Sequence, residues 1–295
     1  MSETIRRAPA ALVIAHPGHE VCVYGWLESA RPQVFILTDG SGRVGQSRLS
    51  ATRQLLSELG LKSGDIFGRF TDRAIYSAVV AQDTELFLSL ARELAAAFVR
   101  AEIVCVAGDA AEDYNSTHDL CRALINAAVE MAQQMSGREI ANYDFPVVGH
   151  SYTDPRQLRT DAIWLRLEED VFQRKIEAAA KYYPELLAEM EGTLNKRRLG
   201  PLRSYLDSKT STEVFTHPLD IFRTECLRPV LPSEWGRELD DKLAQEPPFY
   251  EQYGEAQVAA GHYHQVIRYR DHIRPLAQAL WQGSQKNQIS RGHQA

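Results

Sequence analysis

The sequence lacks several features that would place it in a specialised class of protein. No apolar run approaches the ~18 residues that a membrane-spanning helix needs, and there is neither an internal repeat nor a low-complexity linker. Positive charge is not in excess, because 39 Asp and Glu residues outnumber 33 Lys and Arg residues and give a formal net charge of −6. Nucleic acids and anionic membranes repel such a chain, and we expect it to bind neither.

Cysteine is scarce and scattered along the chain. The cysteines form no CxxC pair, which argues against a disulfide framework and against a cysteine zinc site: Cys22, Cys105, Cys121 and Cys226. Lone cysteines among apolar neighbours are typical of core residues in a reducing compartment. The apolar run near the start ends at His16 and Pro17, which predicts a buried strand rather than a signal peptide. We therefore expect a cytoplasmic protein.

The composition and the hydrophobic pattern are those of a globular α/β protein. Of the 295 residues, 44 % are hydrophobic and 24 % are charged. Nearly all-apolar strands separated by helices predict a mainly parallel sheet covered on both faces, a Rossmann-like three-layer sandwich. The expected strands are 11–15, 33–37, 65–68, 103–107, 145–148 and 162–167, and the expected helices are 19–30, 47–59, 84–100, 118–135 and 170–190.

The pattern becomes irregular after residue 190. We expect residues 1–190 to form the core, residues 191–282 a C-terminal elaboration packed on the same domain, and residues 283–295 a frayed tail. A short final helix is expected at 277–281. Aromatic and arginine residues alternate between 249 and 274, which indicates a lid, a contact with a second copy of the chain, or packing of the elaboration on the sheet, the last of which is favoured.

The clearest chemical motif is AHPGHE at residues 15–20, where the first strand gives way to the first helix. Two imidazoles three positions apart at such a turn, His16 and His19, can converge on one point. His118 begins a helix after the fourth predicted strand and should reach the same edge of the sheet. Three neutral histidines with an open fourth position are typical of catalytic zinc, although other divalent transition metals also suit them. The alternative is that His16 and His19 are only turn and cap residues.

Several polar residues follow the strands at this edge. Asp109, Glu112 and Asp113 follow the fourth strand and are candidates for orienting metal ligands or transferring protons, unless they belong to a solvated loop. Asp39, after the second strand, is either a base or a turn residue that bonds its own backbone. His150, after the fifth strand, is either an acid or oxyanion group or a turn histidine.

A glycine-rich segment allows a different interpretation. Gly40, Gly42 and Gly45 match the letters of a GxGxxG dinucleotide motif. The next expected helix starts only near Ser47, and no acidic residue lies at a clear strand end about 20 residues further on. A rim loop over the metal site is therefore favoured over a nucleotide site.

Taken together, these motifs resemble the LmbE/PIG-L family of zinc-dependent N-deacetylases over about the first 190 residues. The resemblance rests on AHPGHE, on Leu-Thr-Asp-Gly at 37–40, on Arg48 before Leu-Gly at 59–60, and on His118. In that family the motif is AHPDDE, whose histidine and second Asp bind zinc, whose first Asp is the general base, and whose later histidine completes the ligands. The resemblance implies His16 and His118 as ligands, with His19 in place of the second Asp. Gly18 stands at the position of the base, which is therefore missing.

Two functions follow from this resemblance. The first is a metal-dependent hydrolase in which a zinc-bound water cleaves the N-acyl bond, N-acetyl above all, of an amino sugar or a related small conjugate. A substitute base is then needed, for which Glu112 is preferred and Asp39 comes next, with Asp113 and His150 as further candidates. The second is a metal- or ligand-binding protein that kept the fold and lost catalysis together with its base.

Overall fold

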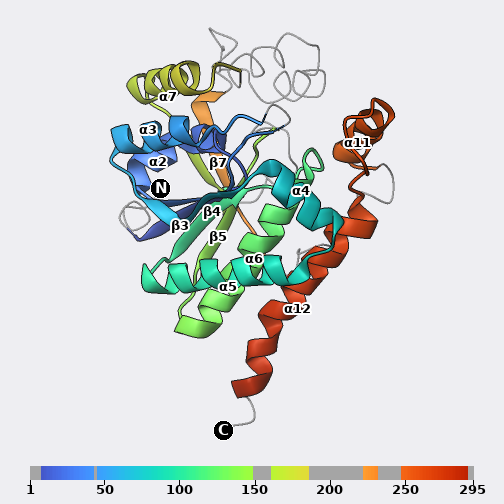
Figure 1. The fold of residues 1–295 in the computed structure, drawn as a ribbon. Helices are drawn as coiled ribbons and strands as arrows, with labels where there is room; N and C mark the ends of the chain where they lie inside the picture. The colour runs from blue at the N-terminus through green and yellow to red at the C-terminus, as the bar shows by residue number, and fades with distance from the viewer. Residues whose placement is uncertain (1–7, 43–44, 149–160, 186–221, 232–246, 292–295) are drawn as a thin grey trace, which may run out of the picture.

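The structure is a computed structural model that describes residues 8–42, 45–148, 161–185, 222–231 and 247–291 (Figure 1). At its centre is a seven-stranded sheet in the order β3-β2-β1-β4-β5-β7-β6. The strands are β1 (Ala10–Ile14), β2 (Gln33–Thr38), β3 (Ser63–Phe70), β4 (Cys105–Asp109), β5 (Ala141–Phe145), β6 (Ile163–Arg166) and β7 (Thr224–Pro229). The main helices are α2 (Tyr24–Ala30), α3 (Leu49–Leu59), α4 (Asp72–Val80), α5 (Thr84–Arg100), α6 (Ser116–Ser136), α7 (Glu169–Tyr182), α11 (Phe249–Ala259) and α12 (Arg274–Arg291).

Most of the sheet is parallel, as the apolar strands predict. β1 pairs with β2 on one side and β4 on the other, β3 pairs with β2, and β5 pairs with β4, all in parallel. β7 runs antiparallel to both β5 and β6. The chain thus builds outward in one direction from β1 and then returns to start β4 on the other side. Ligands of such sheets bind at this switch point, outside the carboxyl ends of the strands.

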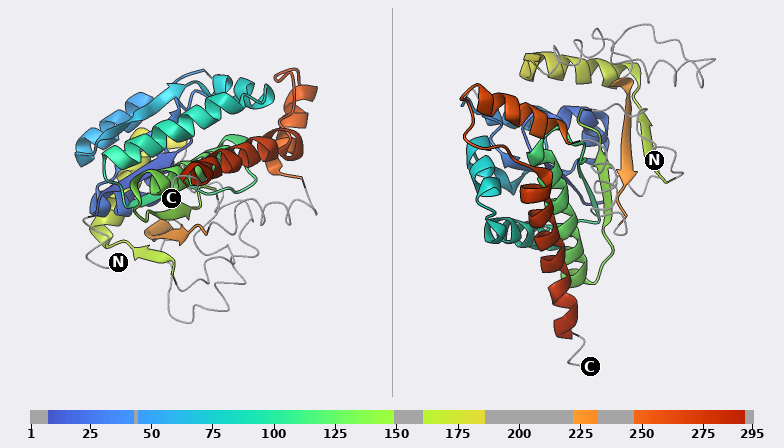
Figure 2. Two further views of the ribbon diagram at one scale, coloured as in Figure 1. Left: turned by 90° about the horizontal axis from the view of Figure 1, so that it is seen from below. Right: turned by 90° about the vertical axis from the view of Figure 1, so that its right-hand side faces the viewer.

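Each face of the sheet carries its own core, so the fold has three layers (Figure 2). Successive side chains of a strand point to opposite faces. In β1, Ala11 and Val13 join the cluster that includes α5, α6 and α12, whereas Leu12 and Ile14 join the cluster that includes α2 and α3. Both faces are buried, which explains why the parallel strands are apolar at nearly every position.

The pattern was least informative where strands carry charges. β5 lies at Ala141–Phe145 instead of the expected 145–148, and β7 was not expected at all. Each of the two strands contains a buried charge. Arg228 Nε on β7 donates to Asp144 Oδ1 on β5 at 2.6 Å, and both side chains are almost fully buried. A charged strand departs from the apolar pattern, and its partner lies too far along the chain to be recognised locally.

Two helices also differ from expectation, and one expected helix is described only in part. α4 was not predicted. α7 covers Glu169–Tyr182, and residues 186–190 of the expected helix 170–190 lie outside the described residues. α12 runs from Arg274 to Arg291, far beyond the expected 277–281, and it packs against α5 and α6 (Figure 1). Much of the expected elaboration, including 191–221 and 232–246, lies outside the described residues.

The aromatic residues near the C-terminus divide into two groups. Tyr250 and Tyr269 belong to the core, as packing of the elaboration on the sheet requires. Phe249 and Tyr253 remain 42 % and 40 % exposed on α11. Phe249 stacks on Tyr114, with ring centroids 5.0 Å apart and planes 3° apart. The association of two copies of the chain remains a prediction.

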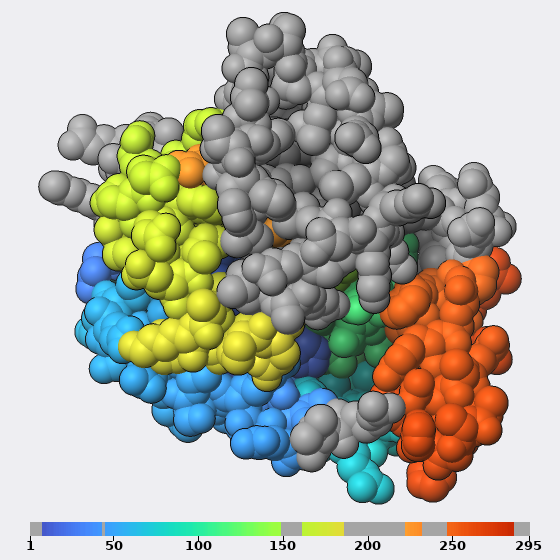
Figure 3. Space-filling view, turned by 90° about the horizontal axis from the view of Figure 1, so that it is seen from above, coloured from blue at the N-terminus to red at the C-terminus, as the bar shows by residue number. Residues whose placement is uncertain are grey.

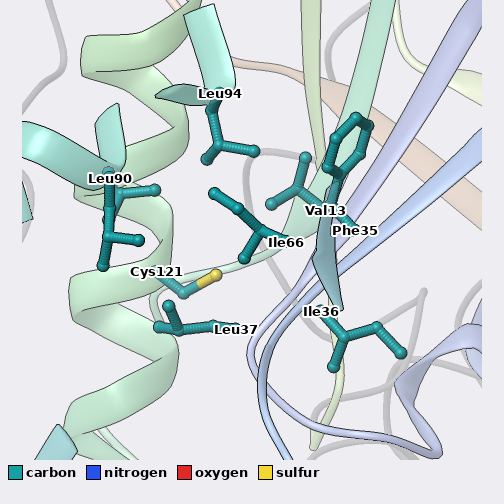
Figure 4. A pocket seen from close by; sticks show the side chains of 9 residues that line it. Val13, Phe35, Ile36, Leu37, Ile66, Leu90, Leu94 and Cys121 are labelled. Atoms are coloured by element: carbon teal, nitrogen blue, oxygen red, sulfur yellow. The ribbon is translucent and has the colours of Figure 1, made fainter. Parts of the chain in front are cut away.

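A small gap interrupts the core between β1, β2, α5 and α6 (Figure 4). Its volume is about 10 Å³, and the side chains around it are apolar: Val13, Phe35, Ile36, Leu37, Ile66, Leu90, Leu94, Cys121 and Leu124. A space of this size holds at most one water molecule, and water needs polar partners. The gap is therefore a packing defect rather than a ligand site.

The state of the cysteines and the hydrophobicity of the helices bear on the expected class of protein. Cys22, Cys105, Cys121 and Cys226 are all free. Within the described ranges, no helix is both long enough and apolar enough to cross a membrane.

Candidate functional site

The three candidate histidines meet at the carboxyl ends of β1 and β4. His16 and His19 lie in the turn and 3₁₀ helix (His19–Val23) that follow β1, and His118 lies in the first turn of α6. The ring centroids of His16 and His19 are 5.3 Å apart, those of His16 and His118 are 5.2 Å apart, and those of His19 and His118 are 4.6 Å apart. Three imidazoles around one tetrahedral zinc have their centroids roughly 5 Å apart, given Zn–N bonds of about 2 Å.

The hydroxyl of Thr38, at the end of β2, determines which nitrogen of His16 carries a proton. Its single hydrogen is donated to the carbonyl of Ala15 at 3.1 Å, so the hydroxyl oxygen can only accept from His16 Nδ1, 2.7 Å away. His16 Nδ1 also lies 3.0 Å from a carboxylate oxygen of Asp72 on α4. Nε2 therefore keeps its lone pair, and it is buried without a hydrogen-bond partner in the described structure.

His19 is oriented by a buried carboxylate. Asp109 at the end of β4 is fully buried, and its Oδ2 lies 2.9 Å from His19 Nδ1 and accepts the backbone N–H of Ala15 at 2.7 Å. A carboxylate can only accept, so Nδ1 of His19 carries the proton and Nε2 has a free lone pair. A carboxylate behind a histidine is the usual arrangement behind a metal ligand.

His118 is held by the start of α6, which Asn115 caps by accepting the N–H of Thr117 at 2.8 Å. His118 as a whole is 4 % exposed, and its Nδ1 has no hydrogen-bond partner in the part of the chain that the structure describes. Burial lowers the pKa of His118 well below its usual value, and the neighbouring His19 and His16 lower it further. Burial also lowers the pKa of His16, partly offset by Asp72. Both rings are therefore neutral near pH 7, the form that binds a metal.

The three rings are close together, but as they stand they do not meet the geometry of a metal-binding group among the described residues. Their planes are inclined by 86° for His16 and His19, by 58° for His16 and His118, and by 81° for His19 and His118. No group of three or more His, Cys, Asp or Glu side chains within the described ranges forms a finished metal site.

The predicted acid and base residues have varied surroundings. Glu112 accepts the backbone N–H groups of Val147 and Val148 through Oε2, at 2.7 and 3.0 Å. Asp39 accepts the N–H of Ser41 at 3.0 Å, which is the backbone bond expected of a turn residue. Asp113 is buried with a positive φ of 61°, and its carbonyl accepts the N–H of Phe249 at the start of α11. His150 lies outside the described residues, and the roles of all four remain predictions.

The loop that carries the glycine motif packs over the same turn. Gly40 has a positive φ of 65°, and a side chain there would begin 2.8 Å from Pro17 and 2.9 Å from Arg48. Arg48, which the family resemblance singled out, donates from Nε to the carbonyl of Gly40 at 2.9 Å. The loop is thus tied to the histidine turn, as a rim loop would be.

Two residues at the site were missed by sequence reasoning. Asp72 begins α4, a helix that was not predicted, and it contacts the His16 ring. Tyr183 lies within the expected helix 170–190 and was given no role at the site, yet it is 1 % exposed and its phenol donates a hydrogen bond to Glu20 in the 3₁₀ helix after β1. No local signal identifies either contact, because each joins segments far apart in the sequence.

Figure 3 shows this edge of the molecule from above. α7, in yellow, lies on one side and α11, in orange, on the other, with the green segment that contains β4 and α6 between them. Hydrogen bonds connect both helices to the loops of the candidate site, from Tyr183 at the end of α7 to Glu20 and from the N–H of Phe249 in α11 to the carbonyl of Asp113.

Comparison with known proteins gives only a distant likeness. No protein-family model matches the chain, and no curated protein matches its sequence. A crystal structure described as a deacetylase–bog complex from the biosynthesis pathway of teicoplanin is 13 % identical with a TM-score of 0.47, covering 75 % of this chain and 98 % of that one. The zinc-inhibited form of teicoplanin deacetylase Orf2 is 11 % identical with a TM-score of 0.44, covering 76 % of this chain and 100 % of that one. At this level the likeness carries no statement about activity.

Proposed function

We propose that the chain is a metal-dependent hydrolase that cleaves an N-acyl bond, N-acetyl above all, of an amino sugar or a related small conjugate in the cytoplasm. His16, His19 and His118 would hold Zn²⁺ or another divalent transition metal. The observation that carries the proposal is the meeting of these three buried rings, whose centroids lie 4.6–5.3 Å apart, at the switch point of the sheet.

The surroundings of each ring support this assignment. Thr38 and Asp109 hold the protons of His16 and His19 on Nδ1, so both leave an Nε2 lone pair for an ion. Neutral histidines leave the charge of the ion uncompensated. When bound, such an ion supplies Lewis-acid catalysis, which polarises a carbonyl group and makes water a better nucleophile.

The remaining task of the chain is to accept and return a proton. Gly18 offers no side chain for this, and Glu112 is our preferred base because it belongs to the loop between β4 and His118. Asp39 is the second choice, and Asp113 and His150 are further candidates at the same edge. A carboxylate in this role would take a proton from water and donate it to the leaving amine.

Three half-exposed aromatic rings lie beside this loop: Tyr114, Phe249 and Tyr253. The backbone N–H of Phe249 donates a hydrogen bond to the carbonyl of Asp113, which holds them there. Flat apolar surfaces of this kind suit the part of a conjugate that extends beyond its amide. They favour a substrate larger than the N-acyl group alone.

The first experiment measures zinc in the purified protein and in two histidine variants. His16→Ala and His118→Ala should each remove most of the bound zinc, because each deletes one ligand, and should abolish acetate release from N-acetyl amino sugars. His262→Ala is the matched control, since that exposed histidine lies outside the site and bonds only to Gln257 among the described contacts.

Two results would contradict the proposal in different ways. If His16→Ala or His118→Ala kept the full zinc content, the proposed metal site would be wrong. Stoichiometric zinc in the parent without hydrolysis of any N-acyl amino sugar or related amide would favour the non-catalytic metal-binding alternative.

A further inference from the structure

A buried chain of hydrogen bonds supports the backbone of the histidine turn. Glu20 is fully buried, and its Oε2 accepts the backbone N–H of Gly18 at 2.7 Å. Its Oε1 accepts a hydrogen bond from the phenol of Tyr183, at the end of α7. The same phenol oxygen lies 2.6 Å from the hydroxyl of Thr52 on α3, so Thr52 donates to it. The turn is thus connected to α3 and α7 through one phenol.

The ring of Tyr183 also fills the space beside Gly18. A Cβ atom added at Gly18 would lie 3.5 and 3.6 Å from two carbons of this ring, which is ordinary contact. The ring of Tyr183 is therefore the nearest neighbour of any side chain placed at position 18. Gly18 also has a φ of 110°, a conformation that favours glycine over residues with a side chain.

We propose that Tyr183 is a positioning residue for the histidine turn and that its ring, together with the positive φ of Gly18, disfavours an acidic side chain at position 18. Its phenol holds Glu20, Glu20 holds the Gly18 amide, and this amide lies midway between His16 and His19. The proton acceptor of the reaction therefore comes from a different strand end. This inference rests on the proposed function, since it concerns the same metal site.

A role in packing alone makes a different prediction. Tyr183 contacts the buried Val21, Tyr24 and Leu55, and a phenylalanine would preserve that apolar cluster. Removing only the phenol, in contrast, takes away one of the two hydrogen bonds that hold the Glu20 carboxylate. Tyr183→Phe therefore separates positioning from packing.

The first test compares zinc affinity in the parent and in Tyr183→Phe, by competition with a chelator. We expect zinc to bind about 10–100-fold more weakly in the variant, the usual effect of losing a residue that supports metal ligands. The visible absorption spectrum of the Co²⁺-substituted protein should change as well, because it reports the arrangement of the ligands. Tyr76→Phe is the matched control, since its phenol bonds to the carbonyl of Gln265 away from this turn.

The outcomes separate the two proposals. If Tyr183→Phe keeps the parent's zinc affinity and Co²⁺ spectrum, the positioning role is wrong while the metal site remains. If the parent itself binds no zinc, the proposed function fails first.

The second test asks whether position 18 can accept the missing base. Gly18→Ala and Gly18→Asp both place a side chain at a positive φ, but only the aspartate adds a carboxylate beside the Tyr183 ring. We expect Gly18→Asp to bind zinc more weakly than Gly18→Ala, or to fold less stably, and to hydrolyse amides no faster than the parent. A gain in kcat on introducing the aspartate would overturn the proposal for position 18.

Discussion

At the scale of single residues, the site is defined by the hydrogen-bond partners of its histidines more than by the histidines alone. Thr38 and Asp109 each determine which ring nitrogen is protonated, and both are fully buried. Because Asp109 also accepts the N–H of Ala15, one carboxylate fixes both the end of β1 and the orientation of His19. Changing such a partner should affect metal binding without removing a ligand.

Asp109→Asn tests this dependence. The amide is nearly isosteric, but it lacks the negative charge that favours the Nδ1–H form of His19. We expect zinc affinity to fall about 10–100-fold, measured by chelator competition. Asp83→Asn is a suitable control, because that exposed carboxylate also accepts a backbone N–H, from Leu86, but at the start of α5. Equal zinc affinities in Asp109→Asn and the parent would show that Asp109 does not support a ligand.

The sequence predicted the histidines better than their supporting residues, for a physical reason. His16, His19 and His118 lie in the turns and first helical turns that follow β1 and β4, and parallel strands bring their carboxyl ends to one edge. Their approach therefore needed only the strand pattern. Glu20 and Tyr183, by comparison, are 163 positions apart, and their contact depends on how α7 packs.

At the scale of elements, buried charges join the second half of the chain to the first. Lys175 on α7 donates to Glu225 Oε1 on β7 at 2.9 Å, and both side chains are almost completely buried. Glu225 in turn accepts the N–H groups of Gly25 and Trp26 at the start of α2. This network determines where α7, and with it Tyr183, lies over the histidine turn. β7 escaped prediction because the charges that fix it interrupt its apolar pattern.

Lys175→Met should destabilise the fold strongly. It leaves the carboxylate of Glu225 buried without its cation, a loss that typically costs about 3–5 kcal/mol. Lys181→Met removes the exposed pair with Glu58 on the same helix and should cost about 0–1 kcal/mol. Urea unfolding of both variants measures the difference. Similar free energies of unfolding for the two would mean that the buried pair does not anchor α7.

At the scale of the whole molecule, the candidate site lies at the switch point between β1 and β4, where the order of the strands in the sheet reverses direction. His16 and His19 follow β1, and His118 lies in α6, which follows the neighbouring strand β4. An ion bound to all three would therefore link two segments about a hundred positions apart in the sequence. The three-layer arrangement could be predicted because it follows from apolar strands alternating with helices. The antiparallel end of the sheet could not, since it depends on pairing between distant charged strands.

Zinc should therefore stabilise the whole fold, and acid should reverse this effect. A ligand that binds only the native state adds about 2.7 kcal/mol at a hundred times its Kd, so the melting temperature should rise with zinc and fall with a chelator. His118→Ala should abolish this response.

Burial lowers the pKa values of His16 and His118 in the metal-free protein, so in the native state these rings take up protons only below the ordinary histidine value of 6.5. The unfolded chain binds these protons first, so this contribution to stability is complete above pH 6.5 and is lost as the pH falls through the native pKa values. Zinc competes with the same protons, and its stabilising effect should persist somewhat below pH 6.5 before it disappears. Melting curves with and without zinc between pH 8 and pH 5 measure this, and a zinc effect that is the same at every pH would contradict ligation by histidine.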